Sequence, residues 1–371
     1  MTSKPAKTNS SLNLETITRR HFLTLAGAFA VRPLWADDAP PQAGAQDAAA
    51  FFLVGDTHYF ADKDNPSQLD PVSRAYTQRL VGWLKKLPGT EMPEAAGGGR
   101  VAVPHGLIHA GEIIDSGDKY NGPYPAMQQT ELAAWIADYG LNGGDGALPW
   151  PVREVHGNHD GPHGEGLVLG HIRERNTRRA GLAKVSDNGL HYSWDWAGVH
   201  FVNLGIVVGG ANGVERARRF APLDSLPFLI ADLAEQVGDS GRPVVLTHHI
   251  DVARYCAPPL PEKAAANEWD YADMVAYHDA IKRYRIAAIL YGHTHTRRVF
   301  EWDGQPPVKE GVPGGIPVFN TDNAAHYKFE EQAFLYFEVS AKSVVVREFK
   351  SPDGWETAAW TPQAWRFPLP G

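Results

Sequence analysis

Residues 286–295 place two histidines directly after a short apolar run. The sequence Ile-Ala-Ala-Ile-Leu-Tyr-Gly-His-Thr-His has an apolar part too short for a typical helix, and this part ends at a glycine. It therefore predicts a buried strand whose carboxyl end passes into a loop. His293 and His295 are two positions apart, so in extended backbone their side chains project to the same side. Imidazole is the commonest side-chain metal ligand, and the pair could hold a metal ion, although histidines at this spacing also occur without one.

Four further apolar runs end in residues of the same chemical kind. They span residues 51–58, 107–115, 152–160 and 243–249. The side chains at their ends are Asp56, His58, Glu112, Asn158, His159, Asp160, His248 and His249. In open α/β sheets, ligands bind beyond the carboxyl ends of the strands. Five strand ends that carry carboxylate, amide and imidazole groups therefore predict one shared site for more than one metal ion.

Helical patterns separate these strands and must position them. Asp70 followed by Pro71 predicts a helix through residue 87, because an Asp cap and a Pro in the first turn both favour helix initiation. Further helices are predicted at residues 127–139, 223–237 and 269–284, and Ala197-Gly198 predicts a hairpin turn. Short β-rich runs follow residue 295. The order of elements predicts an α/β protein with two sheets flanked by helices.

Residues 1–36 resemble a twin-arginine signal peptide. Arg19 and Arg20 precede an apolar stretch of about ten residues, and Ala36 offers a cleavage site. The stretch is too short to span a bilayer, so we expect no stable membrane insertion after processing. We expect the twin-arginine export machinery to deliver the protein to the periplasm or the cell exterior. A disordered basic tail is the alternative.

The rest of the chain is predicted to form one domain between two short flanking segments. The predicted segments are a linker at residues 37–50, a domain at residues 51–350 and a C-terminal tail at residues 351–371. The ligand-bearing strands span most of the central range, so this range should be one structural unit.

The composition is that of a globular protein whose mature form is acidic. Hydrophobic residues make up 43% and charged residues 21% of the chain. Removal of residues 1–36 takes away five basic residues and one acidic residue, so the formal charge falls from −8 to −12. An acidic chain without basic blocks argues against nucleic-acid binding. Cys256 is the only cysteine, which excludes an internal disulfide and a thiolate metal cluster.

The order of the motifs resembles that of the calcineurin-like metallophosphoesterases. The resemblance covers roughly residues 51–325. Its motifs are Asp56-x-His58, Gly111-Glu112, Gly157-Asn158-His159-Asp160, His248, and Gly292-His293-x-His295. It implies a four-layer α/β/β/α sandwich of two mixed sheets flanked by helices, with a two-metal centre that acts on a small phosphate ester.

The resemblance also implies a role for each motif residue. The residues that would hold the first metal ion are Asp56, His58 and His295. The residues that would hold the second are Asn158, His248 and His293. Glu112 falls where the family has the Asp that bridges both ions. His159 would act as the acid near the leaving group, with Asp160 as its orienting partner.

Such a centre has a clear chemical rationale. Two divalent ions about 3.5–4 Å apart can clamp the attacking and leaving oxygens at phosphorus, and a metal-bridging hydroxide is available as the nucleophile near pH 7. We therefore expect a phosphohydrolase that cleaves a phosphomonoester or a phosphodiester, with His159 as general acid. The alternatives are a cyclic-nucleotide or phospholipid phosphodiesterase, and a catalytically weak metal-binding or structural protein that keeps the fold. The nitrogen and oxygen ligands suit Mn, Fe, Zn or Ni.

Glu112 departs from the family pattern, because it adds a methylene between backbone and carboxylate. Metal sites tolerate deviations of only about 0.2 Å, so the backbone must retreat or the bridging mode must change. We expect a functional bridge, and we expect Glu112→Asp to retain or raise activity. The alternative is a weakened centre in which one ion binds poorly.

Three further residues are candidates for contact with substrate. Tyr59 and His249 each adjoin a predicted ligand, and Arg297 follows the last one, where it could meet a substrate phosphate or carry solvated charge. Asp115 is expected to pin its loop. Residues 161–179 are long enough to form a lid or rim of the site.

Overall fold

A computed structural model describes residues 47–210, 219–253, 268–304 and 314–369. The chain divides into two compact units, and all of the described residues belong to the second, Gln42–Gly371. The predicted signal peptide lies outside the described residues. None of the helices in the described ranges has both the length and the apolar character needed to cross a membrane.

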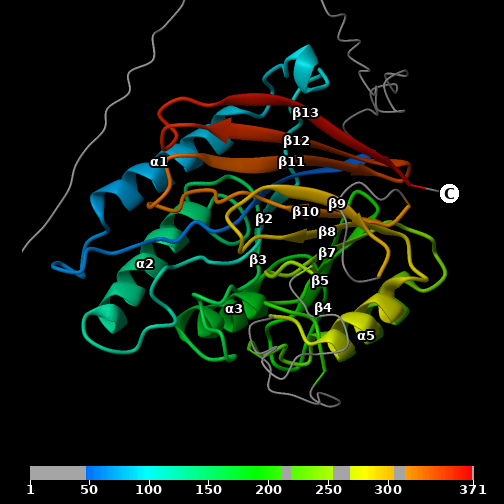
Figure 1. The fold of residues 1–371 in the computed structure, drawn as a ribbon, viewed down its shortest axis with the longest axis horizontal. Helices are drawn as coiled ribbons and strands as arrows, with labels where there is room; N and C mark the ends of the chain where they lie inside the picture. The colour runs from blue at the N-terminus through cyan, green and yellow to red at the C-terminus, as the bar shows by residue number, and fades with distance from the viewer. Residues whose placement is uncertain (1–46, 211–218, 254–267, 305–313, 370–371) are drawn as a thin grey trace, which may run out of the picture. The chain divides into compact units, whose positions relative to one another are not determined.

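The first of two sheets carries three of the predicted ligand-bearing strands. Its strand order is β13-β12-β11-β1-β2-β3. The strands are β1 (Ala48–Val54), β2 (Gly106–His109), β3 (Val152–Glu154), β11 (Gln332–Ser340), β12 (Ser343–Ser351) and β13 (Ala359–Pro368). β1, β2 and β3 are parallel, so their carboxyl ends lie at the same end of the sheet. β11, β12 and β13 run antiparallel to their neighbours and lie side by side in Figure 1.

The second sheet carries the other two ligand-bearing strands. Its order is β4-β5-β6-β7-β8-β10-β9. The strands are β4 (Leu182–Val185), β5 (Tyr192–Trp196), β6 (Val199–Asn203), β7 (Val244–Thr247), β8 (Ile286–Tyr291), β9 (Arg298–Trp302) and β10 (Ile316–Asn320). β6, β7, β8 and β10 are parallel. The predicted hairpin joins β5 and β6, and Ala197 and Gly198 both have positive φ there, at 47° and 77°.

The two sheets pack face to face through an aromatic-rich core. Phe51 of β1 stacks on Phe337 of β11, with ring centroids 4.9 Å apart, and meets Phe201 of β6 edge-on at 5.5 Å. Trp194 and Leu290 from the second sheet are fully buried in the same layer. Because β1 and β8 are buried on both faces, their sequences read as continuous apolar runs.

Helices cover the outer face of each sheet. Those packed on the first sheet are α1 (Pro71–Lys86), α2 (Tyr124–Tyr139) and α3 (Leu167–Arg178). Those packed on the second are α4 (Ser225–Asp232), which continues into a π-helical turn at Leu233–Val237, and α5 (Tyr271–Ile281). Asp70 caps α1 as predicted, since its carboxylate accepts from the N–H groups of Val72 and Ser73. The four-layer α/β/β/α architecture is confirmed.

Three segments differ from the predictions. β1 begins at Ala48, inside the range predicted as a linker. Residues 351–371 were predicted as a tail but contain β13, whose prolines are compatible with a strand at the sheet edge. Residues 161–179 were predicted as a lid or rim, but most of them form α3, which packs on the first sheet and buries Arg175.

Candidate metal centre

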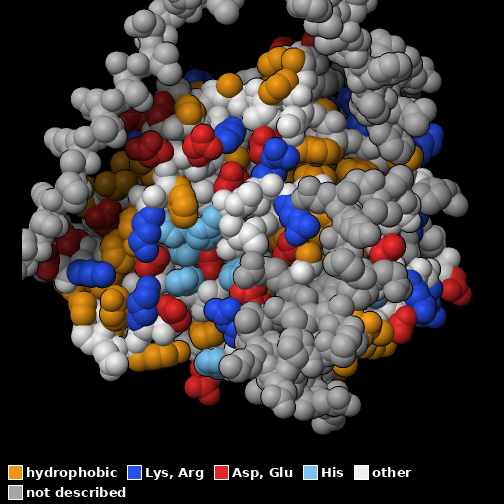
Figure 2. All heavy atoms as spheres, viewed as in Figure 1, with side chains coloured by type: hydrophobic (Ala, Val, Ile, Leu, Met, Phe, Trp, Pro, Cys, Tyr) orange, Lys and Arg blue, Asp and Glu red, His pale blue; other side chains and the backbone are white. Residues whose placement is uncertain are grey.

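Polar side chains from the ends of six strands, the five predicted ones and β10, meet in one cluster. The cluster consists of four overlapping groups of His, Asp and Glu residues. Within each group, the possible ligand atoms all lie within 4.8 Å of one another. The members of these groups are Asp56, His58, Glu112, Asp115, His159, His249, His293, His295 and His326. Figure 2 shows histidine side chains gathered in a patch on the face in view, with Lys and Arg side chains beside it.

The first half of the cluster joins the loops after β1 and β8. His58 Nε2 lies 2.6 Å from Glu112 Oε2 and 3.2 Å from His295 Nε2. His295 Nε2 lies 3.2 Å from the same Glu112 oxygen and 3.6 Å from Asp56 Oδ1. The three residues predicted for the first metal position are therefore brought together.

The second half of the cluster joins the loops after β3, β7 and β8. His249 Nε2 lies 3.4 Å from Glu112 Oε1 and 3.3 Å from Asn158 Oδ1. His293 Nδ1 lies 3.9 Å from the same Glu112 oxygen. His293 and His295 therefore face different oxygens of Glu112, so they do not converge on one point as extended backbone would predict. They lie in the loop after β8, with φ angles of 74° and 50°.

Glu112 lies between the two halves. Its Oε2 faces His58 and His295, and its Oε1 faces His249 and His293. This is the position predicted for the bridging carboxylate. The backbone at Glu112 has a φ of 56°, which differs from the strand geometry before it.

His248 lies outside the cluster, which corrects its predicted assignment to the second metal. Its ring contacts Trp269 and Tyr277 edge-on, at centroid distances of 5.3 and 5.6 Å. Neither ring nitrogen has a hydrogen-bond partner, and burial lowers the pKa of His248 to about 3. Consecutive residues in extended backbone point to opposite faces, so only one of the pair can reach the cluster. His249, predicted only to contact substrate, is that residue.

Asp160 does not orient His159, which corrects a second assignment. Its carboxylate accepts hydrogen bonds from the backbone N–H groups of Ile113 and Ile114, both at 3.0 Å, and of Gly157 at 2.7 Å. Within the described residues, no hydrogen bond joins it to the His159 ring. Asp160 instead ties the loop after β3 to the loop after β2.

His159 faces the cluster from its solvent side. Its Nε2 lies 3.9 Å from Glu112 Oε1, and its Nδ1 lies 3.2 Å from the Asp115 carbonyl oxygen and 3.5 Å from Asp118 Oδ1. The side chain is 31% exposed, so an incoming molecule can reach it. Burial lowers the pKa of His159, but the carboxylates of Asp118 and Glu112 outweigh burial and raise this pKa above its ordinary value.

Asp115 contacts a candidate ligand directly and does more than pin its loop. Its Oδ1 lies 3.2 Å from His58 Nδ1, and its Oδ2 accepts from Lys119 Nζ at 2.9 Å. With Nδ1 held in this way, His58 Nε2 points at Glu112. A carboxylate behind a histidine commonly fixes a metal ligand. Burial would raise the pKa of Asp115, but His58 and Lys119 hold it well below its usual range.

The other two substrate candidates have different surroundings. Tyr59 is fully buried and donates to Asp138 Oδ2 at 2.8 Å, so the prediction that it contacts substrate is wrong. Arg297 lines an open cavity beside His295. Its guanidinium pairs with Glu348 at 2.9 Å and lies over the Trp365 ring.

Sequence reasoning missed one member of the cluster, His326, and one residue beside it, Glu268. The His326 ring lies 4.1 Å from that of His58 and 4.9 Å from that of His295. It follows the apolar run of β10, so the signal used for the other strands could have found it. Glu268 accepts from His293 Nε2 at 3.0 Å, and no strand pattern in the sequence points to it.

The backbone is strained at the candidate ligands. Positive φ angles, rare for residues other than glycine, occur at Asp56 (54°), His58 (42°), Glu112 (56°), His293 (74°) and His295 (50°). Each such residue costs on the order of 1–3 kcal/mol, and such residues concentrate where the surrounding structure holds a functional geometry. The strained backbone therefore lowers the stability of the fold but directs these side chains towards one another.

Two glycines allow the loops to approach this closely. A Cβ at Gly292 would lie 2.4 Å from Asp56 Oδ2, and one at Gly157 would lie 2.6 Å from Glu112 Cγ. Both distances are shorter than real Cβ contacts, so a larger residue would push the ligands apart. This is a physical reason for the glycine that precedes the ligands in these two motifs.

Asp56 and Glu112 are buried carboxylates of the cluster without a Lys or Arg partner among the described residues. Burial, reinforced by the charge of Glu112, raises the pKa of Asp56. Burial would also raise the pKa of Glu112, but His58 and His249 hold it well below its usual value. For His58, burial is outweighed by Glu112 and Asp115, and the pKa rises to about 10. None of the described Lys and Arg residues forms an ion pair with Asp56 or Glu112.

These side chains fit a pair of divalent cations. Each half offers imidazole nitrogens together with one oxygen of Glu112, and such donors suit Mn, Fe, Zn or Ni. His293 Nδ1 is buried without a hydrogen-bond partner and faces Glu112, as a ligand atom would. Added positive charge would offset the desolvation of the two carboxylates.

Comparisons with known proteins agree with this chemistry. The family model described as calcineurin-like phosphoesterase matches residues 49–297. A search of curated proteins found no match. Among solved structures, a dimetal phosphatase from Danio rerio superposes with a TM-score of 0.53 at 13% identity, over 87% of this chain and 100% of that one. PhoD superposes with a TM-score of 0.52 at 11% identity, over 87% of this chain and 70% of that one.

At these identities the two structures show a common fold. The family match covers about two-thirds of the chain. It includes every strand end that contributes to the cluster except that of β10, which is followed by His326. The chain therefore belongs to the calcineurin-like phosphoesterase family and is a hydrolase that acts on phosphate esters.

Proposed function

We propose that the protein hydrolyses a phosphomonoester or a phosphodiester with the help of two divalent cations. The observation that carries this proposal is the position of Glu112, whose two oxygens face two separate sets of histidines. A single-metal site would need only one of these sets.

Each set would hold one cation. The residues proposed for the first are Asp56, His58, His295 and Glu112. The residues proposed for the second are Asn158, His249, His293 and Glu112. When bound, the cation pair supplies positive charge for the phosphoryl oxygens and acidity for the attacking water.

The protein's own groups would do the remaining work. Asp115 holds the ring of His58, and Glu268 holds that of His293, so both imidazoles present a fixed nitrogen. Asp160 fixes the loop backbone around Glu112 through three N–H groups. We propose His159 as the group that gives a proton to the leaving oxygen, because it is partly exposed at the edge of the cluster and its pKa is raised.

Hydrolysis of aryl phosphates tests this proposal. The protein is loaded separately with Mn, Zn and Fe, and 4-nitrophenyl phosphate and bis(4-nitrophenyl) phosphate are supplied as the monoester and the diester. We expect hydrolysis of at least one, and a fall in kcat of roughly 100- to 10,000-fold in His159→Ala. His278→Ala, a change on α5 outside the cluster, is the matched control. If the metal-loaded parent and His159→Ala are equally inert, the fold serves another purpose, such as binding or structural support.

We further propose that residues 1–36 direct export through the twin-arginine machinery. The support is the Arg19-Arg20 pair before a short apolar stretch. Replacement of both arginines by lysine should leave the protein in the cytoplasm, as measured by cell fractionation. Unchanged export of this variant would contradict the proposal.

A further inference from the structure

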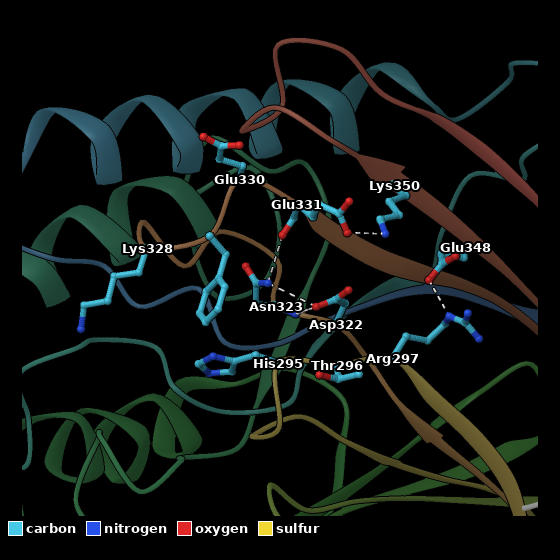
Figure 3. Close-up of a pocket in the computed structure, with 11 residues that line it drawn as sticks. His295, Thr296, Arg297, Asp322, Asn323, Lys328, Glu330, Glu331, Glu348 and Lys350 are labelled. Carbon is cyan, nitrogen blue, oxygen red and sulfur yellow. Dashed lines mark hydrogen bonds and ion pairs between the residues drawn. The ribbon is translucent and has the colours of Figure 1, made fainter. Parts of the chain in front are cut away.

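An open cavity adjoins the first half of the metal centre. It has a volume of about 530 Å³, within the range of small-molecule sites, and His295 forms part of its wall. The rest of the wall comes from the β8–β9 loop, the 322–331 loop and β12. Figure 3 shows Asp322 and Asn323 in the middle of this lining, between His295 and the Glu331–Lys350 pair. A substrate whose phosphate lies at the metal centre can therefore extend its organic part into this cavity.

One wall is a fixed pair of opposite charges. Arg297 lies 2.9 Å from Glu348, and its guanidinium carbon lies 5.1 Å from the centre of the Trp365 ring. The Glu348 side chain is only 5% exposed, so this pair is held in place before a ligand arrives. It offers N–H donors and a carboxylate acceptor side by side.

A second wall holds the carboxylate of Asp322, which forms no ion pair with the described Lys and Arg residues. Asp322 uses Oδ1 to accept from the backbone and side-chain N–H groups of Asn323, at 2.8 and 3.2 Å. Asn323 is itself buried and bonded to the Glu331 carbonyl oxygen, so the Asp322 carboxylate is well positioned. Thr296 is an exposed residue of the lining, and its hydroxyl adds a group that can donate or accept.

An aromatic ring covers the side of the cavity next to the metal centre. Phe329 is 44% exposed, an unusual state for a phenyl ring, yet it is fixed by edge-on contacts with His295 and His326 at 5.4 and 5.0 Å. Its free face offers apolar contact beside the polar walls.

We propose that this cavity binds the hydroxyl-rich organic part of the substrate, so that the enzyme acts on a phosphorylated sugar or polyol. The inference rests on the phosphohydrolase function proposed above. Hydroxyl groups both donate and accept hydrogen bonds, so they match walls on which N–H, hydroxyl and carboxylate groups alternate. The C–H face of a sugar ring or polyol chain can lie on the exposed Phe329 ring.

The charges of the cavity disfavour a strongly charged organic part. The lining has three basic and four acidic side chains, so its formal charge is nearly balanced. Four of them are already joined in two ion pairs, Arg297–Glu348 and Lys350–Glu331. A second phosphate would have to compete with these carboxylates, whereas a neutral polyol would not.

Substrate selectivity tests this inference. For the metal-loaded protein, kcat/KM is measured on glucose 6-phosphate and glycerol 1-phosphate, and compared with phenyl phosphate and phosphorylethanolamine. We expect at least one of the two polyol esters to exceed phenyl phosphate by roughly tenfold or more, because several hydrogen bonds are gained. The ratio of polyol ester to phenyl phosphate should then fall roughly tenfold in Asp322→Asn and roughly threefold in Thr296→Val.

Asp279→Asn is the matched control, since it makes the same chemical change on an exposed part of α5. This variant should keep the parent's ratio of kcat/KM on the polyol ester to kcat/KM on phenyl phosphate. Thr296 is exposed, so its variant reports on the cavity even if Asp322→Asn folds poorly. Two outcomes would overturn the inference and leave the proposed function intact. In the first, the parent hydrolyses phenyl phosphate but does not prefer a polyol ester. In the second, the ratio of polyol ester to phenyl phosphate is unchanged in both Asp322→Asn and Thr296→Val. A preference for phosphorylethanolamine that is lost in Asp322→Asn would also overturn it, in favour of an ammonium ligand. No hydrolysis of any ester would overturn the proposed function itself.

Discussion

Two buried carboxylates at the ends of adjacent strands have opposite surroundings. Glu154, the last residue of β3, is fully buried and bonded to two arginines, with Arg175 Nε at 2.8 Å and Arg179 Nη2 at 2.5 Å. Burial would raise the pKa of Glu154, but the two guanidinium groups lower it to about 2. Glu112, in the loop after β2, is also buried, but the titratable groups around it among the described residues are histidines and Asp56.

The difference separates a structural site from a functional one. At Glu154 the positive charge belongs to the chain, so folding alone completes the network. At Glu112 the chain supplies nitrogen and oxygen atoms in strained loops, and none of the described Lys or Arg residues pairs with this carboxylate. That arrangement suits positive charge that arrives from outside, which is what a metal centre requires.

The largest effect is expected from removing one charge at each site. Glu154→Gln leaves two buried arginines without their partner and should lower the free energy of unfolding by roughly 3–5 kcal/mol. Asp56→Asn removes a carboxylate whose pKa is already raised by burial, so the metal-free protein should keep or gain stability while losing metal. Urea denaturation of the metal-free proteins measures both. Equal losses of stability would remove the distinction between the two sites.

The contribution of Glu154 to the free energy of unfolding should depend on pH. The native pKa is about 2 and that of an unfolded glutamate is about 4.3, so the unfolded state binds more protons between these values. Stability from this group is therefore complete above about pH 4.3 and is lost as the pH falls towards 2, a loss of roughly 3 kcal/mol. The difference in unfolding free energy between the parent and Glu154→Gln should shrink from about pH 5 to about pH 2.5. A constant difference would mean that Glu154 does not carry this charge interaction.

Two adjacent histidines sharpen the comparison further. His249→Ala removes a proposed metal ligand. Loss of a residue that only holds a ligand in place costs roughly 10- to 100-fold in activity, so loss of the ligand itself should lower activity by more than roughly 100-fold. His248→Leu replaces two unpartnered ring nitrogens with an apolar group of similar size, and should keep activity and metal content. Phosphatase assays with elemental analysis compare the two. The reverse result would restore the assignment of His248 to the second metal.

A smaller effect is expected from the residue behind His58. Asp115→Asn weakens the hold on His58 Nδ1 and should reduce metal affinity by roughly 10- to 100-fold. Titration of the metal-free protein with Mn or Zn measures this affinity. Asp118→Asn is a comparison variant, because that carboxylate faces His159 but not His58. Equal affinity in the parent and Asp115→Asn would show that His58 needs no such support.

The sequence predicts the fold and the meeting of strand ends because both follow from local patterns. Buried strands read as short apolar runs, and Gly followed by polar residues marks where each ends, so Asp56, His58, Glu112 and His295 are found in this way. The parallel arrangement of the strands then brings the ends together.

What the sequence does not predict is the direction of individual side chains. The choice between His248 and His249 depends on which of two neighbours faces the cluster after β7, and a pair of like residues carries no signal for that. The roles of Asp160 and Asp115 are missed for a similar reason. The loop backbone decides that Asp115 reaches an imidazole, that of His58, and that Asp160 reaches backbone N–H groups instead. β13 escapes notice because prolines interrupt its alternation.

The number of metal ions per chain tests the central claim most directly. The purified protein, expressed in medium supplemented with Mn, Fe, Zn and Ni, is examined by elemental analysis. The arrangement around Glu112 predicts two divalent ions per chain. A chain that carries none under these conditions would contradict the claim that the buried carboxylates at the strand ends await an external charge.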